Sequence, residues 1–217
     1  MVDQPRRPDV IETTNGGEMT AHRSAHDAGF GPYTVLDLHE LPEDGKGFEL
    51  EDGWLIEEAA GYRHNWIARR LARLIEDASA GTLVALDGGE WEVNTPSGVR
   101  KPDIAVLDVE FAHALLLEDS PKLIPGNALV VAVEVISHGS SSERTDRLRK
   151  AHEYAALGIP EYWIIEQKPQ IRVLRLVLDG ATYRSGTAVA AGSEFVADVD
   201  WDKPFRVAFD PATLLGH

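Results

Sequence analysis

The stretch that decides the fold is ALVVAVEVISHGSSSERTDRLRK, residues 128–150. Residues 128–136 are apolar except for Glu134, a pattern that predicts a strand buried on both faces and central in a sheet. A buried carboxylate is costly unless it is paired, protonated or bound to a metal. Glu134 is therefore either a salt-bridged residue at an exposed strand end or a member of a functional site.

The residues after this strand predict a helix. Residues 137–139 interrupt the strand, and Ser140 followed by Glu143 has the spacing of a capping box. We expect the helix to cover residues 141–157 and to end at Gly158. A strand at residues 161–166 would then complete a strand-helix-strand crossover, which permits parallel pairing.

Lys150 lies at the edge of the buried face of this helix. Its apolar stem can lie along the core and bring the ammonium toward the end of the strand that carries Glu134. The alternative is an ion pair with Asp146 on a solvated surface, four residues away on the same stripe. The neighbouring apolar stripe, which we expect to face the core, consists of Leu148, Ala151 and Ala155.

The composition favours a single globular domain. The chain has 217 residues, of which 43% are hydrophobic, enough for a sizeable core. Residues 1–30 are polar and lack apolar periodicity, so we predict a disordered leader followed by one domain at residues 31–217. With no cysteine, no secretion signal and no apolar run of membrane-spanning length, we expect a cytoplasmic protein without a membrane partner.

The net charge of -15 opposes a general attraction to nucleic acid, because phosphates are bound by Lys and Arg. A nucleic-acid enzyme with this charge needs either an uneven charge distribution or divalent cations at a carboxylate cluster.

The remaining periodicity predicts an α/β fold with a mixed central sheet flanked by helices. Asp103 alternates with Ala105 and Leu107, so it is a second carboxylate among small and apolar neighbours. His64 stands near the start of a helix, where capping or packing is the more common role. Residues 108–125 are compatible with a helix fragment or an irregular connection. The other expected helices are residues 35–41 and 62–80, and the other expected strands are residues 48–50, 54–57, 83–86, 90–94, 100–107, 170–178, 181–183, 194–197 and 204–209.

Together these residues resemble a known family of nucleases. Pro102-Asp103 on one strand, Glu134 on a buried strand and a nearby lysine resemble the PD-(D/E)XK superfamily, most closely the Uma-type family of restriction-endonuclease-like proteins. The resemblance covers residues 33–209 and implies a restriction-endonuclease-like fold. It is carried by FELEDG at 48–53, RKPDIAVLD at 100–108, VAVEVIS at 131–137 and DRLRKAHEYAALGIPEYWII at 146–165.

The resemblance implies roles for particular residues. Asp103 and Glu134 would be metal-binding carboxylates, the main-chain carbonyl of Val135 would complete the inner shell, and Glu49 would be the acidic residue that the family carries ahead of its core. The superfamily has its lysine two residues after the glutamate, where this chain has Ile136. The family carries the lysine on the following helix instead, a position that matches Lys150. The implied catalytic residues are Glu49, Asp103, Glu134 and Lys150.

The implied activity is that of a Mg-dependent or Mn-dependent endodeoxyribonuclease, since oxygen ligands without thiolates suit a hard cation. For DNA contact the sequence offers five cations, and Arg100, Lys101, Arg147 and Tyr154 are the predicted substrate-binding residues. The alternative to DNA contact is that these five cations form a solvated helix face. They are Arg100, Lys101, Arg144, Arg147 and Arg149.

Double-strand cleavage would need two sites, which hints at a homodimer. Two alternatives remain open from the sequence. One is a catalytically silent scaffold of the same fold that binds a nucleic-acid or protein partner, and the other is a metal-dependent enzyme acting on another phosphoester.

Overall fold

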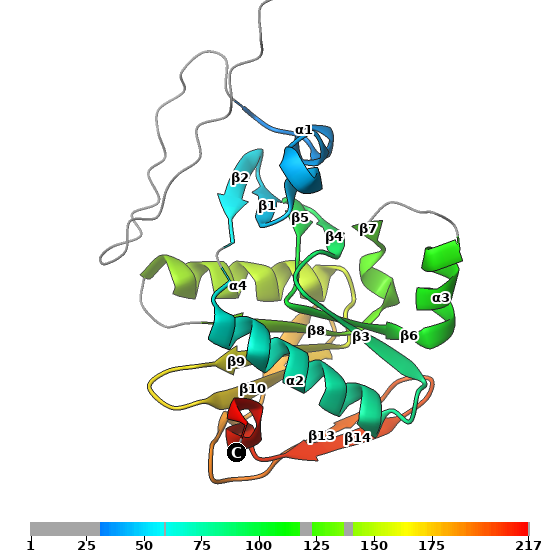
Figure 1. Cartoon of the computed structure of the whole chain (residues 1–217), viewed down its shortest axis with the longest axis vertical. Helices are drawn as coiled ribbons and strands as arrows, with labels where there is room; N and C mark the ends of the chain where they lie inside the picture. The colour runs from blue at the N-terminus through cyan, green and yellow to red at the C-terminus, as the bar shows by residue number, and fades with distance from the viewer. Residues whose placement is uncertain (1–30, 59, 118–122, 137–140, 217) are drawn as a thin grey trace, which may run out of the picture.

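A computed structural model describes residues 31–58, 60–117, 123–136 and 141–216. The predicted leader at residues 1–30 and the predicted cap at Ser140 lie outside the described residues. The described chain forms a mixed α/β architecture with two larger sheets, a β-hairpin and helices packed on both faces of the largest sheet (Figure 1). The predicted fold class is thereby confirmed.

The largest sheet has the strand order β11-β10-β9-β8-β6-β3, with β12 paired to β10. Within it β8 and β9 are parallel, and the other neighbouring pairs are antiparallel, so the crossover predicted through residues 141–157 is present. Its strands are β3 (Leu83–Asp87), β6 (Ile104–Asp108), β8 (Leu129–Ile136), β9 (Glu161–Glu166), β10 (Arg172–Asp179), β11 (Thr182–Ser185) and β12 (Val189–Ala190).

A second sheet, with the order β2-β1-β5-β4-β7, lies on the side of the first sheet that α4 covers (Figure 1). Its strands are β1 (Phe48–Glu51), β2 (Trp54–Glu57), β4 (Glu92–Thr95), β5 (Gly98–Arg100) and β7 (Leu123–Ile124). The hairpin consists of β13 (Phe195–Val199) and β14 (Phe205–Phe209). The α-helices are α1 (Val35–His39), α2 (Tyr62–Ala78), α3 (Val109–Leu117) and α4 (Ser141–Ala156), and the 3-10 helices are η1 (Pro42–Gly45), η2 (Gly126–Ala128) and η3 (Pro211–Leu215).

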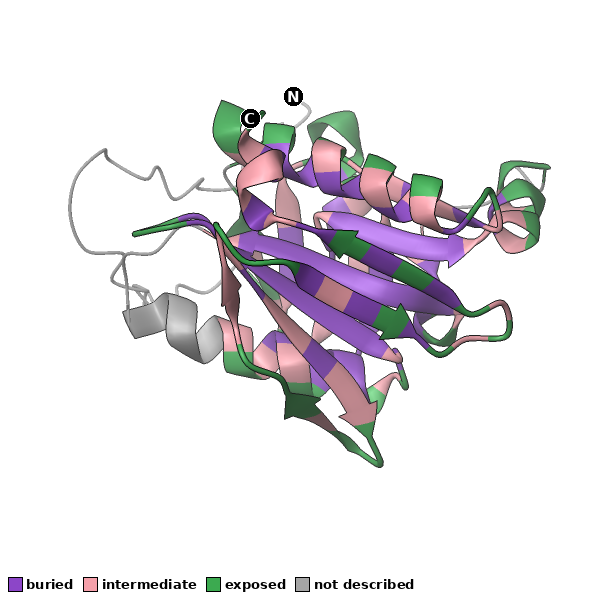
Figure 2. Ribbon diagram, turned by 90° about the horizontal axis from the view of Figure 1, so that it is seen from below, coloured by how far each residue is buried: buried purple, intermediate pink, exposed green. Residues whose placement is uncertain are grey.

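The two long helices α2 and α4 cover opposite faces of the largest sheet (Figure 2). Along β6 the side chains alternate as predicted: Ile104 and Val106 pack in the cluster that contains the α2 residues, whereas Ala105 and Leu107 pack in the cluster that contains Tyr154 of α4. Almost every residue of β8 is buried, as expected of a central strand between two helical layers. None of the described helices is long and apolar enough to cross a membrane.

Two sequence-based expectations about the elements need correction. The strand expected at residues 100–107 is two strands, β5 ending at Arg100 and β6 beginning at Ile104. Pro102 stands in the gap and has no amide N–H to donate to a ladder. Asp103 therefore precedes β6 rather than lying within it. The residues left undetermined at 108–125 contain helix α3.

The second correction concerns the buried face of α4. Leu148, expected in the core, is 68% exposed, whereas Lys150 and Tyr154 are 5% and 0% exposed. The helix thus turns a polar stripe inward, which is stable only because that stripe meets partners of opposite charge or hydrogen-bonding groups. Charge pairing, and not the apolar pattern alone, sets the rotation of α4.

This difference predicts contrasting effects of two leucine truncations. Leu71 of α2 is 0% exposed, so Leu71→Ala should lower the free energy of unfolding by about 2–5 kcal/mol through lost burial and a residual cavity. Leu148→Ala should change it by less than about 0.5 kcal/mol. Urea denaturation followed by circular dichroism measures both. Equal losses in the two variants would contradict the outward orientation of Leu148.

Candidate active site

The four residues predicted to be catalytic come from four separate parts of the chain. Glu49 lies in β1 of the second sheet, Asp103 directly precedes β6, Glu134 lies in β8 and Lys150 lies in α4. The Lys150 Nζ is 3.1 Å from Glu49 Oε1 and 3.4 Å from Glu134 Oε2. The ammonium therefore points inward, between one carboxylate from each sheet.

Lys150 is held by negative charge on several sides. In addition to Glu49 and Glu134, Oε1 of Glu58 lies 3.8 Å from its Nζ. Burial alone would lower the pKa of Lys150, but the charges of Glu134 and Glu49 outweigh burial and raise that pKa well above its ordinary value. The ammonium form is thus strongly favoured, and Lys150 is placed to act as a cation and hydrogen-bond donor.

Glu134 has the opposite electrostatic situation. Burial raises its pKa well above the ordinary value, Lys150 works against this rise, and the charges of Asp103 and Glu49 add to it. Its Oε1 accepts a hydrogen bond of 2.9 Å from the Tyr154 hydroxyl. Glu134 is consequently a carboxylate with too little positive charge around it, a situation that a proton or a bound cation relieves.

Asp103 is fixed by two donors on the more open side of the site. Its Oδ2 accepts a 2.7 Å hydrogen bond from the amide of Val135, and its Oδ1 lies 2.7 Å from Nε2 of His64 in α2. Within a strand, the N–H and C=O of one residue point toward the same edge. The carbonyl of Val135, which the resemblance implicates as a metal ligand, therefore faces the same edge as Asp103.

His64 is the residue whose role the sequence reasoning missed. Burial would lower the pKa of His64, but its hydrogen bond to Asp103 and the charge of that carboxylate outweigh burial and raise the pKa above its ordinary value. Glu58, which also adds to this rise, was missed as well. The available signal was alternation along β2: Glu49 pairs with Ile56, so Ile56 and Glu58 lie on the same face of the second sheet as Glu49.

A buried network of charges lies behind Glu49. Glu49 is 0% exposed, and its strand β1 lies between β2 and β5, so it does not occupy a solvated position on an edge strand. Its Oε1 accepts from the Lys101 amide at 2.8 Å, and its Oε2 accepts from Arg100 at 3.0 Å. Arg100 also contacts Glu153 of α4 and Glu51 of β1.

Three of the predicted substrate-binding residues are buried and paired inside the protein. Arg100 and Tyr154 are both 0% exposed and are engaged with carboxylates. The buried Lys101 donates from Nζ to the Gly45 carbonyl at 2.8 Å and pairs with Glu92 at 3.2 Å. All three side chains have internal partners in this structure, and their contact with a substrate stays a prediction.

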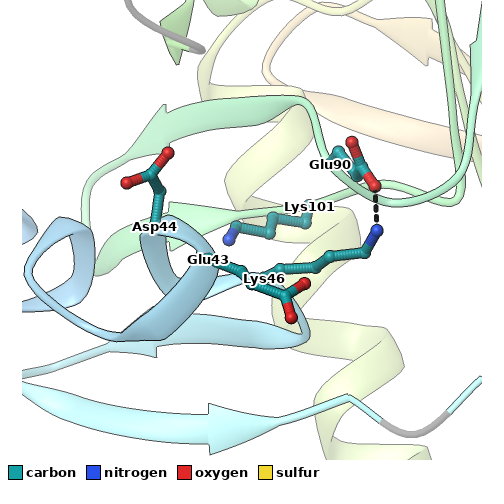
Figure 3. Close-up of a pocket in the computed structure, with 5 residues that line it drawn as sticks. All are labelled: Glu43, Asp44, Lys46, Glu90 and Lys101. Atoms are coloured by element: carbon teal, nitrogen blue, oxygen red, sulfur yellow. Dashed lines mark ion pairs between the residues drawn. The ribbon is translucent and has the colours of Figure 1, made fainter.

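Lys101 points away from the carboxylate site because neighbouring residues at the end of a strand project in opposite directions. Its side chain enters a separate pocket of about 270 Å³ (Figure 3). The pocket is lined by Glu43, Asp44, Lys46, Glu90 and Lys101. Arg147, the fourth predicted substrate contact, is partly exposed and is paired with Glu166.

The donors available to a metal ion are oxygens. Among residues 31–58, 60–117, 123–136 and 141–216, no group of three or more His, Asp or Glu side chains is arranged to hold a metal ion. The predicted ligands are the carboxylates of Asp103 and Glu134, and the carbonyl of Val135 faces the same strand edge as Asp103. In donor type and in their excess of negative charge, these residues fit a hard divalent cation.

Comparison with known proteins places the chain in a family. The model of the Uma2 family, described as "Putative restriction endonuclease", matches residues 35–198. The chain belongs to the Uma2 family. The family resemblance predicted from the sequence is confirmed, and membership supports a nuclease-like function. No curated protein matches the chain.

A solved structure supports the fold of this Uma2 protein. It is the crystal structure of a "putative nuclease belonging to DUF820" from Anabaena variabilis, with a TM-score of 0.54 and 17% sequence identity. The match covers 78% of this chain and 90% of that chain. At this identity the match shows a shared fold, which agrees with the predicted nuclease-like architecture.

The charge arrangement predicts opposite effects of two substitutions on stability. Lys150→Met leaves Glu49 and Glu134 buried without their shared cation, so the free energy of unfolding should fall by about 3–5 kcal/mol. Glu134→Gln removes a carboxylate from a group with excess negative charge, so stability should stay unchanged or rise. Urea denaturation at neutral pH with a chelator measures both. A loss in Glu134→Gln as large as in Lys150→Met would contradict the description.

Proposed function

We propose that this Uma2 protein is a metal-dependent endonuclease that hydrolyses phosphodiester bonds in DNA. The observation that carries the proposal is the Lys150 ammonium, held 3.1 Å from Glu49 and 3.4 Å from Glu134. The charge of Asp103 is close enough to Glu134 to raise its pKa. Such a combination of carboxylates and an inward-pointing ammonium suits hydrolysis of a phosphate ester, and membership in a nuclease family supports it.

Asp103, Glu134 and the carbonyl of Val135 are the residues that would hold Mg²⁺ or Mn²⁺. Their oxygens suit a hard cation, and two carboxylates in a poorly solvated site gain free energy when positive charge is bound. A bound divalent cation supplies two effects: it lowers the pKa of a water molecule and offsets negative charge that develops on the phosphate.

The other side chains prepare this site before a substrate arrives. His64 and the Val135 amide hold both oxygens of Asp103, and the Tyr154 hydroxyl holds one oxygen of Glu134. Lys150 presents N–H donors and a full positive charge, which stabilise negative charge on phosphate oxygens in the transition state. Fixed donors of this kind need no reorganisation during the reaction, so they favour the transition state over the bound substrate.

For contact with the DNA backbone, Arg147 is the remaining candidate among the predicted residues, since its side chain is partly exposed. Its guanidinium would have to exchange Glu166 for a phosphate. We further propose that double-strand cleavage is carried out by a homodimer, which supplies one site for each strand.

One observation favours a second candidate function, a catalytically silent scaffold that binds a nucleic-acid or protein partner. Both oxygens of Glu134 already have partners, Tyr154 and Lys150, and the described residues include no three-ligand cluster. The two candidates differ in whether the purified protein cuts DNA.

The nuclease proposal predicts metal-dependent cleavage of supercoiled plasmid by the wild type. Asp103→Asn removes a metal ligand and Lys150→Met removes the cation, so each should slow cleavage by about 100-fold or more. Gel analysis after incubation with Mg²⁺ or Mn²⁺ measures the rates. Arg206→Gln, on a side chain 63% exposed in β14, serves as the matched surface control and should cut at the wild-type rate.

Equal nicking by the wild type and Asp103→Asn would indicate a contaminating nuclease and contradict the assignment. A wild type that cuts no DNA, yet retards labelled DNA in a gel, would support the scaffold instead.

The proposed metal site also predicts a shift in stability that does not depend on activity. Mg²⁺ or Mn²⁺ should stabilise the wild type, by about 2.7 kcal/mol at a free concentration 100 times Kd. In Glu134→Gln most of this shift should vanish because one ligand is lost. Thermal denaturation during a metal titration measures the effect, and an equal shift in both proteins would place the metal elsewhere.

A further inference from the structure

Arg100 lies at the centre of the buried charge network, although it does not touch Lys150. It is 0% exposed. Its Nε and one terminal nitrogen donate to the two oxygens of Glu153 at 2.7 and 3.1 Å, and its other terminal nitrogen donates to Glu49 at 3.0 Å. Glu51 lies 2.8 Å from the guanidinium. A planar fork with three carboxylate partners has one orientation that satisfies all of them.

Glu49 connects Arg100 to Lys150. One of its oxygens is held by Arg100, and the other is shared between the Lys101 amide at 2.8 Å and the Lys150 ammonium at 3.1 Å. Because Glu49 is fully buried and every oxygen is used, it is not placed to bind a substrate. Its position allows it to hold the ammonium of Lys150 on the side opposite Glu134.

Glu153 supplies a second connection, through the helix itself. It lies three residues after Lys150 in α4, so both side chains project from the same face. Besides the two bonds from Arg100, Glu153 accepts a 2.6 Å hydrogen bond from the Ser97 hydroxyl at the turn before β5. These contacts fix the rotation and depth of α4 against the second sheet at the level of Lys150.

We propose that Arg100 is a positioning residue of the active site, which sets the location of the Lys150 ammonium through Glu49 and through Glu153. The kinetic part of this inference rests on the proposed nuclease function, whereas the geometric part does not. It also assigns Glu49 to positioning and not to contact with the reacting atoms.

Lysine cannot replace arginine in this role. An ammonium at position 100 keeps the charge but lacks the fork that reaches Glu153 with two bonds and Glu49 with a third. Arg100→Lys should therefore leave Glu49 and α4 less constrained. Glu153→Gln is the milder change, because it keeps the shape of the side chain and removes one acceptor oxygen together with the charge.

Two measurements test the inference on Arg100→Lys, Glu153→Gln and the surface control Arg206→Gln. The first is the rate at which acetic anhydride labels Lys150, followed by mass spectrometry well below the melting temperature, with the exposed Lys168 as internal reference. Release of the ammonium should make labelling of Lys150 several-fold faster in the first two variants. Arg206→Gln should label like the wild type.

The second measurement is steady-state cleavage of DNA. Misplacement of Lys150 should lower kcat by about 10- to 100-fold, as for other residues that orient a catalytic group, with little change in KM. A network that serves only stability would lower the melting temperature and leave both labelling and the kcat of the folded protein unchanged, which would overturn the inference.

The two measurements also separate the inference from the proposed function. If the wild type cuts no DNA but Lys150 is labelled faster in Glu153→Gln, the nuclease proposal fails and the positioning role stands. If Arg100→Lys does not fold, the isosteric Glu153→Gln decides alone: unchanged labelling of Lys150 in that variant overturns the proposal.

Discussion

The rest of the structure around the site depends on one shared cation, the ammonium of Lys150. Glu49, Glu134 and Glu58 approach it from different elements, within 3.1 to 3.8 Å. One buried positive charge does not balance this many carboxylates, so each must find another partner or keep a raised affinity for protons and cations. Arg100 balances the deep side through Glu49. Among the side chains that the structure describes, no guanidinium pairs with Glu134, and this carboxylate lies where a divalent ion is expected.

Much of the fold follows from local periodicity. The bounds of β2 and β9 agree with the strands expected from sequence, and β8 differs from its expected start by one position, because short apolar runs between turn residues leave few alternatives. The break between β5 and β6 was missed although Pro102, which has no amide N–H for a ladder, marks it in the sequence. The exposure of Leu148 in α4 was missed for a different reason: a hydrophobic pattern does not register that Lys150 and Glu153 find buried partners of opposite charge.

The convergence of Glu49, Asp103, Glu134 and Lys150 was predicted because carboxylates within apolar strands need partners, and a family motif linked them. The functions of the flanking cations were not predictable in this way. Arg100 and Lys101 stand beside Asp103 in sequence, which resembles a phosphate-binding pair, yet both are buried and paired with carboxylates. The charged end of a long side chain can reach either a buried carboxylate or the solvent, and the sequence does not distinguish the two. His64 carried no distinguishing neighbour in the sequence.

The ion pair between Glu49 and Lys150 joins residues 101 positions apart. During synthesis, a nascent chain that has emerged through β8 already contains Glu49 and Asp103 with their partners Arg100 and His64, but it lacks Lys150, which joins Glu49 to Glu134. Because the N-terminal part of a chain can begin to fold first, Glu134 would spend that interval without the ammonium that offsets its negative charge. The connection between Glu49 of the second sheet and Glu134 of the first can therefore form only once α4 has left the ribosome, so this part of the candidate site is completed at a late stage of translation.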